Sequence, residues 1–163
     1  MTRAQTPGKP GRERDRKRKR ATAPAGAWSK CRDTLAAAIA SLQEDDYLIV
    51  IASRAANHFV QFYGHGALGL RLEAVSNTYL EEGHRLSDAA CLDLLALGWN
   101  PPTYVPAEGV EEPKGGSPNF YLDMGAPVPH ARVAALAVET LRTIYRVQDP
   151  RRLAYEVSGK AAI

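Results

Sequence analysis

Cysteine and long apolar runs are both scarce in this chain of 163 residues. The two cysteines, Cys31 and Cys91, stand at no spacing typical of metal ligands, and small apolar thiols in a core are favoured over a disulfide or a nucleophile. No apolar run approaches the roughly 18 residues that cross a bilayer, and no apolar signal-peptide segment follows the charged N-terminus. We therefore expect a cytoplasmic protein without a membrane partner.

The sequence also lacks a catalytic or metal-binding constellation. The chain has four histidines, His58, His65, His84 and His130. None is paired at H-x-x-x-H spacing, and none lies in a cluster of Cys or acidic residues, as metal ligands do. His84, Ser87 and Asp88 contain the residue types of a hydrolase triad, but Ser87 is better explained as a helix cap. We expect no enzymatic activity, no cofactor and no metal ion.

One glycine-rich stretch fits a nucleotide-binding pattern by its letters. Residues 64–69 read G-x-G-x-x-G, and Glu81 and Glu82 follow at about the distance of a ribose-binding acid. A dinucleotide fingerprint must open a helix, whereas residues 68–74 alternate apolar and polar positions as a strand does. The glycines are therefore interpreted as turn residues.

The positive charge is confined to the N-terminus. Residues 1–29 carry nine Lys or Arg against two acidic residues, a net +7, and the remainder carries twelve basic and sixteen acidic residues, a net −4. Residues 1–26 hold no large apolar residue after Met1, so we expect a disordered basic tail at residues 1–28. It is either a solubilising extension or a sequence-blind tether that binds nucleic-acid phosphates weakly. The candidate contacts are Arg16, Lys17, Arg18, Lys19 and Arg20.

The first half of the remaining chain predicts a helix followed by a meander of strands. Residues 29–43 repeat apolar positions at steps of three and four, with Ser29 placed to cap the helix. Residues 47–52, 57–63 and 68–74 then show β-branched or alternating patterns. Short turns between them predict three antiparallel strands.

The second half predicts two helices and two more strands. A helix at residues 88–97 is capped by Ser87 and stopped by Gly98, and a loop spans residues 104–116. Trp99 and Phe120 are the expected packing anchors after the helix stop and at the next strand. The later elements are a strand at 119–124, a helix from Pro129 to about Tyr145 and a strand at 153–157. Arg151 and Arg152, before the last strand, could bind a carboxylate, although a solvated role is favoured.

Several of these segments together resemble the TY-Chap family of peptide-binding chaperones, which is related to type III secretion chaperones and YbjN proteins. The resemblance covers roughly residues 30–157, and its most specific part is Leu97-Gly98-Trp99 followed by Pro118-Asn119-Phe120. The other matching segments are Val60-Gln61-Phe62, Leu72 to Asn77 with Tyr79-Leu80, Leu86-Ser87, Pro102, and Leu141-Arg142 to Tyr155.

This resemblance implies an α+β domain at residues 29–158, with a loose C-terminus at 159–163. About five antiparallel strands are packed by three helices in the order α-β-β-β-α-β-α-β, as in type III secretion chaperones. The implied function is binding of a protein or peptide client, against an apolar sheet face or an exposed edge. A homodimer stays open, and the Ala- and Arg-rich composition points to a bacterial source. Candidate contacts are Phe59, Phe62, Tyr63, Trp99 and Phe120, most of which a domain of this size needs inside.

Overall fold

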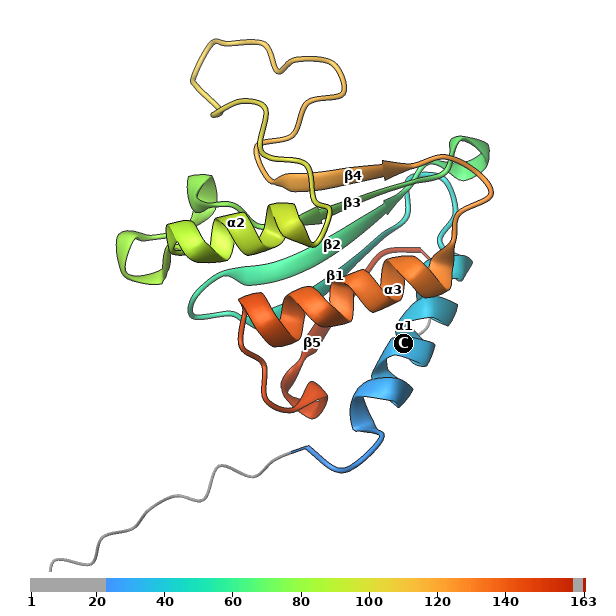
Figure 1. Cartoon of the computed structure of the whole chain (residues 1–163). Coiled ribbons are helices and arrows are strands. Elements are labelled where there is room, and N and C mark those ends of the chain that lie inside the picture. Colours follow the sequence, from blue (N-terminus) through green and yellow to red (C-terminus); the bar gives the residue numbers. More distant parts are fainter. Residues whose placement is uncertain (1–22, 160–162) are drawn as a thin grey trace, which may run out of the picture.

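A five-stranded antiparallel sheet, packed on one face by helices, forms the body of the computed structural model (Figure 1). The structure describes residues 23–159 and 163. The strand order is β4-β3-β2-β1-β5. The expected α+β class and element order are confirmed, and the bounds are α1 Ala27–Ser41, β1 Tyr47–Ser53, β2 His58–Gly64, β3 Leu70–Ala74, α2 Asp88–Ala96, β4 Phe120–Met124, α3 His130–Glu139 and β5 Ala154–Val157.

The core lies between the sheet and the helices. Successive side chains of a strand point to opposite faces, so every second residue of β1 and β2 faces the helices. Four of these inward residues are fully buried, namely Leu48, Val50, Val60 and Phe62. They form one apolar cluster with Ile39 of α1, Leu94 of α2 and Val133 of α3. Burial of this one face provides the main favourable term in folding.

The first helix begins earlier than the sequence pattern predicted. Gly26, in a left-handed conformation with φ 80°, precedes α1 and occupies the N-cap. The helix therefore starts at Ala27, and Ser29 lies inside its first turn instead of capping it. Trp28, now part of the helix, packs against the core. The prediction of a Ser29 cap was wrong because a glycine can enter the helix without a side-chain cap.

The expected strand at residues 68–74 begins two residues late. A 3₁₀ turn at Gly66–Leu68 precedes β3, and Leu68 is 81% exposed. Gly69 has φ 117°, and a Cβ atom there would overlap the carbonyl oxygen of Met124. The glycine-rich stretch is therefore a hairpin turn between β2 and β3, as interpreted, and Leu68 belongs to the turn.

Both ends of α2 follow the prediction closely. The Ser87 hydroxyl accepts a hydrogen bond from the Ala90 amide at 3.2 Å and caps the start of the helix. At the other end the Trp99 amide donates to the Leu94 carbonyl at 3.1 Å and the Gly98 amide donates to the Leu95 carbonyl at 3.0 Å. Gly98 has φ 101°, so the helix ends in a Schellman motif that requires glycine.

The helix expected to run to Tyr145 changes its hydrogen-bond pattern near its end. After Glu139 the chain forms a π-helical turn at Thr140–Ile144. Thr140 is fully buried, and its hydroxyl accepts a hydrogen bond from the Trp99 indole N–H at 3.0 Å while donating to the Leu136 carbonyl. Trp99 thus anchors the segment after α2 to the segment after α3. Apolar spacing alone could not distinguish a π turn from a continued α-helix.

Candidate functional site: the open face of the sheet

The face of the sheet that points away from the helices carries the candidate site. We call it the outer face. It consists of the outward side chains of the five strands, namely Tyr47, Ile49, Ile51, Phe59, Gln61, Tyr63, Arg71, Glu73, Tyr121, Asp123, Ala154 and Glu156. The α-helices α1, α2 and α3 lie on the opposite face (Figure 1). Two tyrosines of the outer face are accessible, since Tyr47 is 41% and Tyr63 38% exposed.

Strand register arranges these side chains in rows across the sheet. Tyr47 pairs with Tyr63, and Tyr63 pairs with Arg71. The next row joins Ile49, Gln61 and Glu73, and a shorter row joins Ile51 and Phe59. An apolar half over β1 and β2 therefore adjoins a charged half over β3 and β4.

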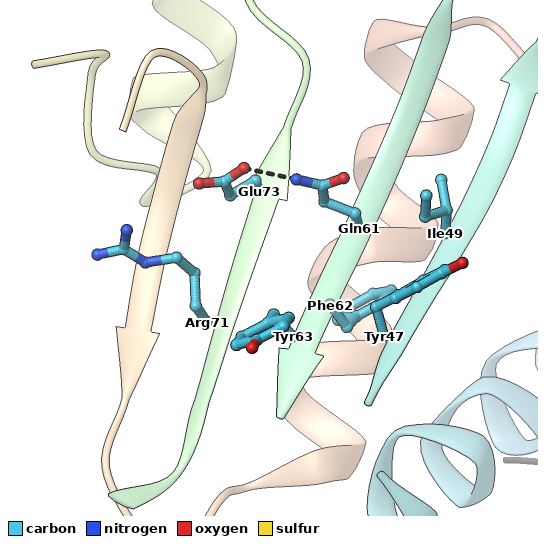
Figure 2. Close-up of a pocket in the computed structure, with 7 residues that line it drawn as sticks. All are labelled: Tyr47, Ile49, Gln61, Phe62, Tyr63, Arg71 and Glu73. Atoms are coloured by element: carbon cyan, nitrogen blue, oxygen red, sulfur yellow. Dashed lines mark hydrogen bonds between the residues drawn. The ribbon is translucent and has the colours of Figure 1, made fainter. Parts of the chain in front are cut away.

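A shallow depression of about 330 Å³ lies where the two halves meet. We call it the tyrosine pocket, and Figure 2 shows the side chains around it. Tyr47, Ile49 and Tyr63 supply its apolar surface, and Gln61, Arg71 and Glu73 border the other side. Such a surface can accept an apolar side chain of a chain laid across the strands.

Glu73 is a buried carboxylate held by neutral donors. It accepts hydrogen bonds from Gln61 Nε2 at 2.7 Å, Ser117 Oγ at 2.7 Å and Asn119 Nδ2 at 3.1 Å. Asn119 Oδ1 in turn accepts from the Ser76 amide at 3.1 Å. Buried polar groups are costly unless they are hydrogen-bonded. Ser117 and Asn119, next to the start of β4, therefore join that segment to β3.

Arg71 fixes the same segment by charge. Its Nε donates to Asp123 Oδ1 at 2.7 Å and its Nη2 to Asp123 Oδ2 at 2.8 Å. It also donates to the carbonyls of Gly115 and Gly116, both at 2.9 Å, and lies over the Tyr121 ring. The Arg71 guanidinium lowers the pKa of Asp123. Arg71 is thus fully engaged within the protein.

The segment between α2 and β4 forms a loop with a closed neck. The Thr103 amide donates to the Ser117 carbonyl at 2.8 Å, and the Ser117 amide donates to Thr103 Oγ1 at 2.8 Å. Residues 104–114 continue beyond this neck, past the edge strand β4 (Figure 1); we call them the loop tip. The prediction of a long loop at residues 104–116 is confirmed by the absence of helix and strand there.

A second pocket, of about 440 Å³, lies between the loop and the outer face. We call it the loop pocket. Phe59, Tyr79 and Tyr104 provide its aromatic side chains, and Glu73 and Glu112 its carboxylates. Partial burial and then the Glu112 carboxylate raise the pKa of Tyr104 to about 12. The loop pocket shares Gln61, Arg71 and Glu73 with the tyrosine pocket, so the two pockets form one continuous surface.

Comparison with protein families identifies the chain. A family model described as TY-Chap3, T3SS (YopN, CesT) and YbjN peptide-binding chaperone 3, matches residues 21–159. The chain belongs to the TY-Chap3 family. The resemblance to TY-Chap proteins at residues 30–157 is thereby confirmed. No curated protein and no solved structure matches the chain.

The structure divides the aromatic candidates of this TY-Chap3 chain into two groups. Phe62, Trp99 and Phe120 lie in the core, with exposed fractions of 0%, 2% and 5%. They cannot contact a client without unfolding, so they are better explained as packing residues. Phe59, half-buried, and Tyr63 lie on the outer face. The tail candidates Arg16, Lys17, Arg18, Lys19 and Arg20 lie outside the described residues.

Other residues of the site were not anticipated. Tyr47 and Ile49 could have been found from the alternation of faces in β1. Residues 47–52 are apolar throughout, however, so the sequence does not show which of them face outward. Tyr79 and Tyr104 come from a 3₁₀ turn and a loop, and Glu112 from the loop tip. Their approach to the sheet depends on the folded neck, so no local pattern signals them.

The remaining polar motifs serve the fold. Within the described part of the chain, no three His, Cys, Asp or Glu side chains gather to hold a metal ion. Ser87 caps α2, and the His84 carbonyl accepts from His58 Nε2 at 3.0 Å. Arg151 binds a carboxylate of the chain itself, Asp149. Mainly through that hydrogen bond, the pKa of Asp149 falls to about 2.

Proposed function

We propose that this TY-Chap3 protein is a non-enzymatic, chaperone-like protein that binds an extended segment of a client polypeptide on its outer face. The observation that carries the proposal is that α-helices cover one face of the sheet, while the outer face presents accessible tyrosines. The family description, a peptide-binding chaperone, supports a polypeptide as the ligand. Exposed apolar surface of this kind commonly marks an interaction site.

The face supports this role better than the two sheet edges do. On the β4 edge, the amides and carbonyls of Asn100 and Tyr121 already pair with each other. The β5 edge is only four residues long, at Ala154–Val157. Strand addition at either edge would therefore be short. The outer face instead spans all five strands and holds both pockets.

The test uses labelled, carboxymethylated α-lactalbumin as a permanently unfolded probe, with binding followed by fluorescence anisotropy. A Tyr47→Ser, Tyr63→Ser double variant should weaken binding about tenfold or more, because two aromatic contacts are lost. The matched control is Leu92→Ser, Leu95→Ser. These leucines are 65% and 40% exposed, and both lie on α2.

The control should bind within about twofold of the unchanged chain. Failure of the unchanged chain to bind the probe would contradict the function. Equal loss in the two double variants, or a larger loss in the control, would contradict the outer face as the site. Far-ultraviolet circular dichroism of each variant shows whether the fold is retained.

The segregated charge supports a second, separate proposal for residues 12–20. The net +7 of residues 1–29 against −4 in the remainder suits phosphate binding by the tail. A labelled DNA duplex should bind the full chain in 50 mM salt and lose most of that affinity at about 300 mM. A chain lacking residues 1–22 should not bind. Binding that survives the deletion, or that ignores salt, would contradict the tether.

Two broader expectations also stay proposals. A cytoplasmic location is supported by the free thiols of Cys31 and Cys91. Within residues 23–159, every helix is too short or too polar to span a bilayer. A homodimer is tested by sedimentation at increasing protein concentration, where a constant monomer mass would contradict it.

A further inference from the structure

We propose that the loop pocket holds the side chain of a lysine or arginine of the bound client, next to apolar residues placed in the tyrosine pocket. This inference rests on the proposed function and defines the client class as extended segments that combine apolar and basic residues. The loop pocket is lined by Phe59, Tyr79 and Tyr104 and by the carboxylates of Glu73 and Glu112.

The first reason is the charge balance of the pocket. Of the described residues that line it, only Arg71 is cationic. Its guanidinium is already bidentate with Asp123 and donates to two loop carbonyls. Arg71 therefore balances Asp123, and the charges of Glu73 and Glu112 are left over. A cation from outside would complete the pocket.

The second reason is the way Glu73 is held. Its hydrogen-bond donors are Gln61, Ser117 and Asn119, all of them neutral. Neutral donors stabilise a buried carboxylate but leave its charge in place. Burial raises the pKa of Tyr79 and of Tyr104, and the negative charges of Glu112 and then Glu73 raise both further, so these charges act across the pocket.

The third reason is the aromatic lining. Tyrosine and phenylalanine rings attract ammonium and guanidinium groups at their faces, and the stems of Lys and Arg pack well on apolar surface. Phe59, Tyr79 and Tyr104 therefore suit a long cationic side chain better than a small ion. An anion would meet two carboxylates, and a purely apolar side chain would desolvate Glu112 without compensation.

The position of the pocket links it to the rest of the client. The loop pocket and the tyrosine pocket share Gln61, Arg71 and Glu73. The Gln61 to Glu73 hydrogen bond crosses from β2 to β3 at this junction (Figure 2). A chain laid across the strands can thus place an apolar residue over Tyr47 and Tyr63 and a basic residue beside Glu112. The loop tip then favours a basic side chain of the client at this position through the charge of Glu112.

The experiment uses fluorescein-labelled twelve-residue peptides of alternating apolar and polar residues that differ only at one central position, which is Lys, Arg, Gln or Glu. Binding to the full chain is measured by anisotropy at 50 mM salt. The Lys or the Arg peptide should bind about fivefold more tightly than the Gln peptide, and the Glu peptide should bind least. Comparison of the Lys and Arg peptides shows which cation the pocket prefers.

The variant Glu112→Gln should remove the preference for the basic peptide, measured as the ratio of the affinities for the Lys or Arg peptide and the Gln peptide within that variant. Glu112 is exposed, so the substitution should not disturb folding. Its matched control is Glu108→Gln, another exposed glutamate of the loop tip that does not line the pocket. The control should keep the full preference.

The outcomes separate this inference from the function beneath it. Equal binding of the Lys, Arg and Gln peptides to the unchanged chain would overturn the basic-residue site and leave the proposed function standing. A preference that survives Glu112→Gln, or that is lost equally in Glu108→Gln, would also overturn it. Absence of binding by all the peptides would count against the proposed function itself.

Discussion

The two faces of the sheet are built from the same strands and differ in almost everything else. Phe62 and Tyr63 are neighbours in β2, yet Phe62 is fully buried beneath the helices and Tyr63 is 38% exposed. The inner residues join one cluster with all three α-helices. The outer residues pack mainly against one another across the strands.

This difference separates stability from binding. An inner side chain has its contacts in the folded chain already, and removal of those contacts leaves a cavity. An outer tyrosine such as Tyr47 gains less from folding, because 41% of its surface stays in water. Exposed apolar side chains of this kind lower solubility, and apolar surface of this kind often marks an interaction site.

The sharpest test of the comparison replaces each of the two neighbouring residues of β2 by alanine in turn. Phe62→Ala should lower the free energy of unfolding by about 3–5 kcal/mol, because a large buried ring is deleted. Tyr63→Ala should lower it by about 1 kcal/mol or less, because the lost contacts are a cross-strand contact, an edge contact with the His65 ring and a solvent-exposed hydrogen bond to Asp45. Urea denaturation followed by circular dichroism measures both. Similar losses in the two variants would break the distinction between the faces.

A smaller effect is expected at the junction behind the inner face. Trp99→Phe removes the hydrogen bond to Thr140 Oγ1 and part of a buried ring. We expect a loss of about 2 kcal/mol in unfolding free energy. Trp28→Phe is the control, because Trp28 is only half-buried on α1, and it should cost clearly less. Equal costs would mean that Trp99 does not couple α2 to the turn after α3.

The smallest effect concerns the ion pair of Arg71 and Asp123 on the outer face. Asp123 has a lowered pKa when folded, so the pair stabilises the fold above the ordinary Asp pKa of about 3.9 and loses that contribution as the pH falls through the lower folded value. The Asp123 side chain is 53% exposed, so Asp123→Asn should cost less than about 1 kcal/mol at pH 7.

Urea denaturation at pH 7 and near pH 3 measures this dependence. The difference between the unchanged chain and Asp123→Asn should shrink at the lower pH. Asp33→Asn is the control, with a side chain that is 67% exposed and bonded only to Arg32. A difference that grows on acidification would show that the pair does not act through the charge of Asp123.

Local sequence was sufficient for most of the fold. Ser87 and Gly98 define α2 because a cap and a left-handed glycine act within a few residues. The alternation at residues 57–63 predicted that Phe62 and Tyr63 lie on opposite sides of a strand, but not which side is buried, and both were candidate contacts. The errors fell at Ser29 and Leu68, where Gly26 and Gly69 adopt conformations that an apolar pattern does not record.

The sequence by itself thus determined the order of elements, the α+β class and the resemblance to TY-Chap proteins, because periodicity, caps and turns are local properties. Only the tertiary structure decided that the outer face is open and that Tyr79, Tyr104 and Glu112 meet Glu73 across the loop pocket. Glu73 belongs to β3, Tyr79 to a 3₁₀ turn, and Tyr104 and Glu112 to the loop tip, far along the chain. Their meeting depends on the neck that Thr103, Ser117 and Arg71 close, and such long-range hydrogen bonds form only once the sheet exists.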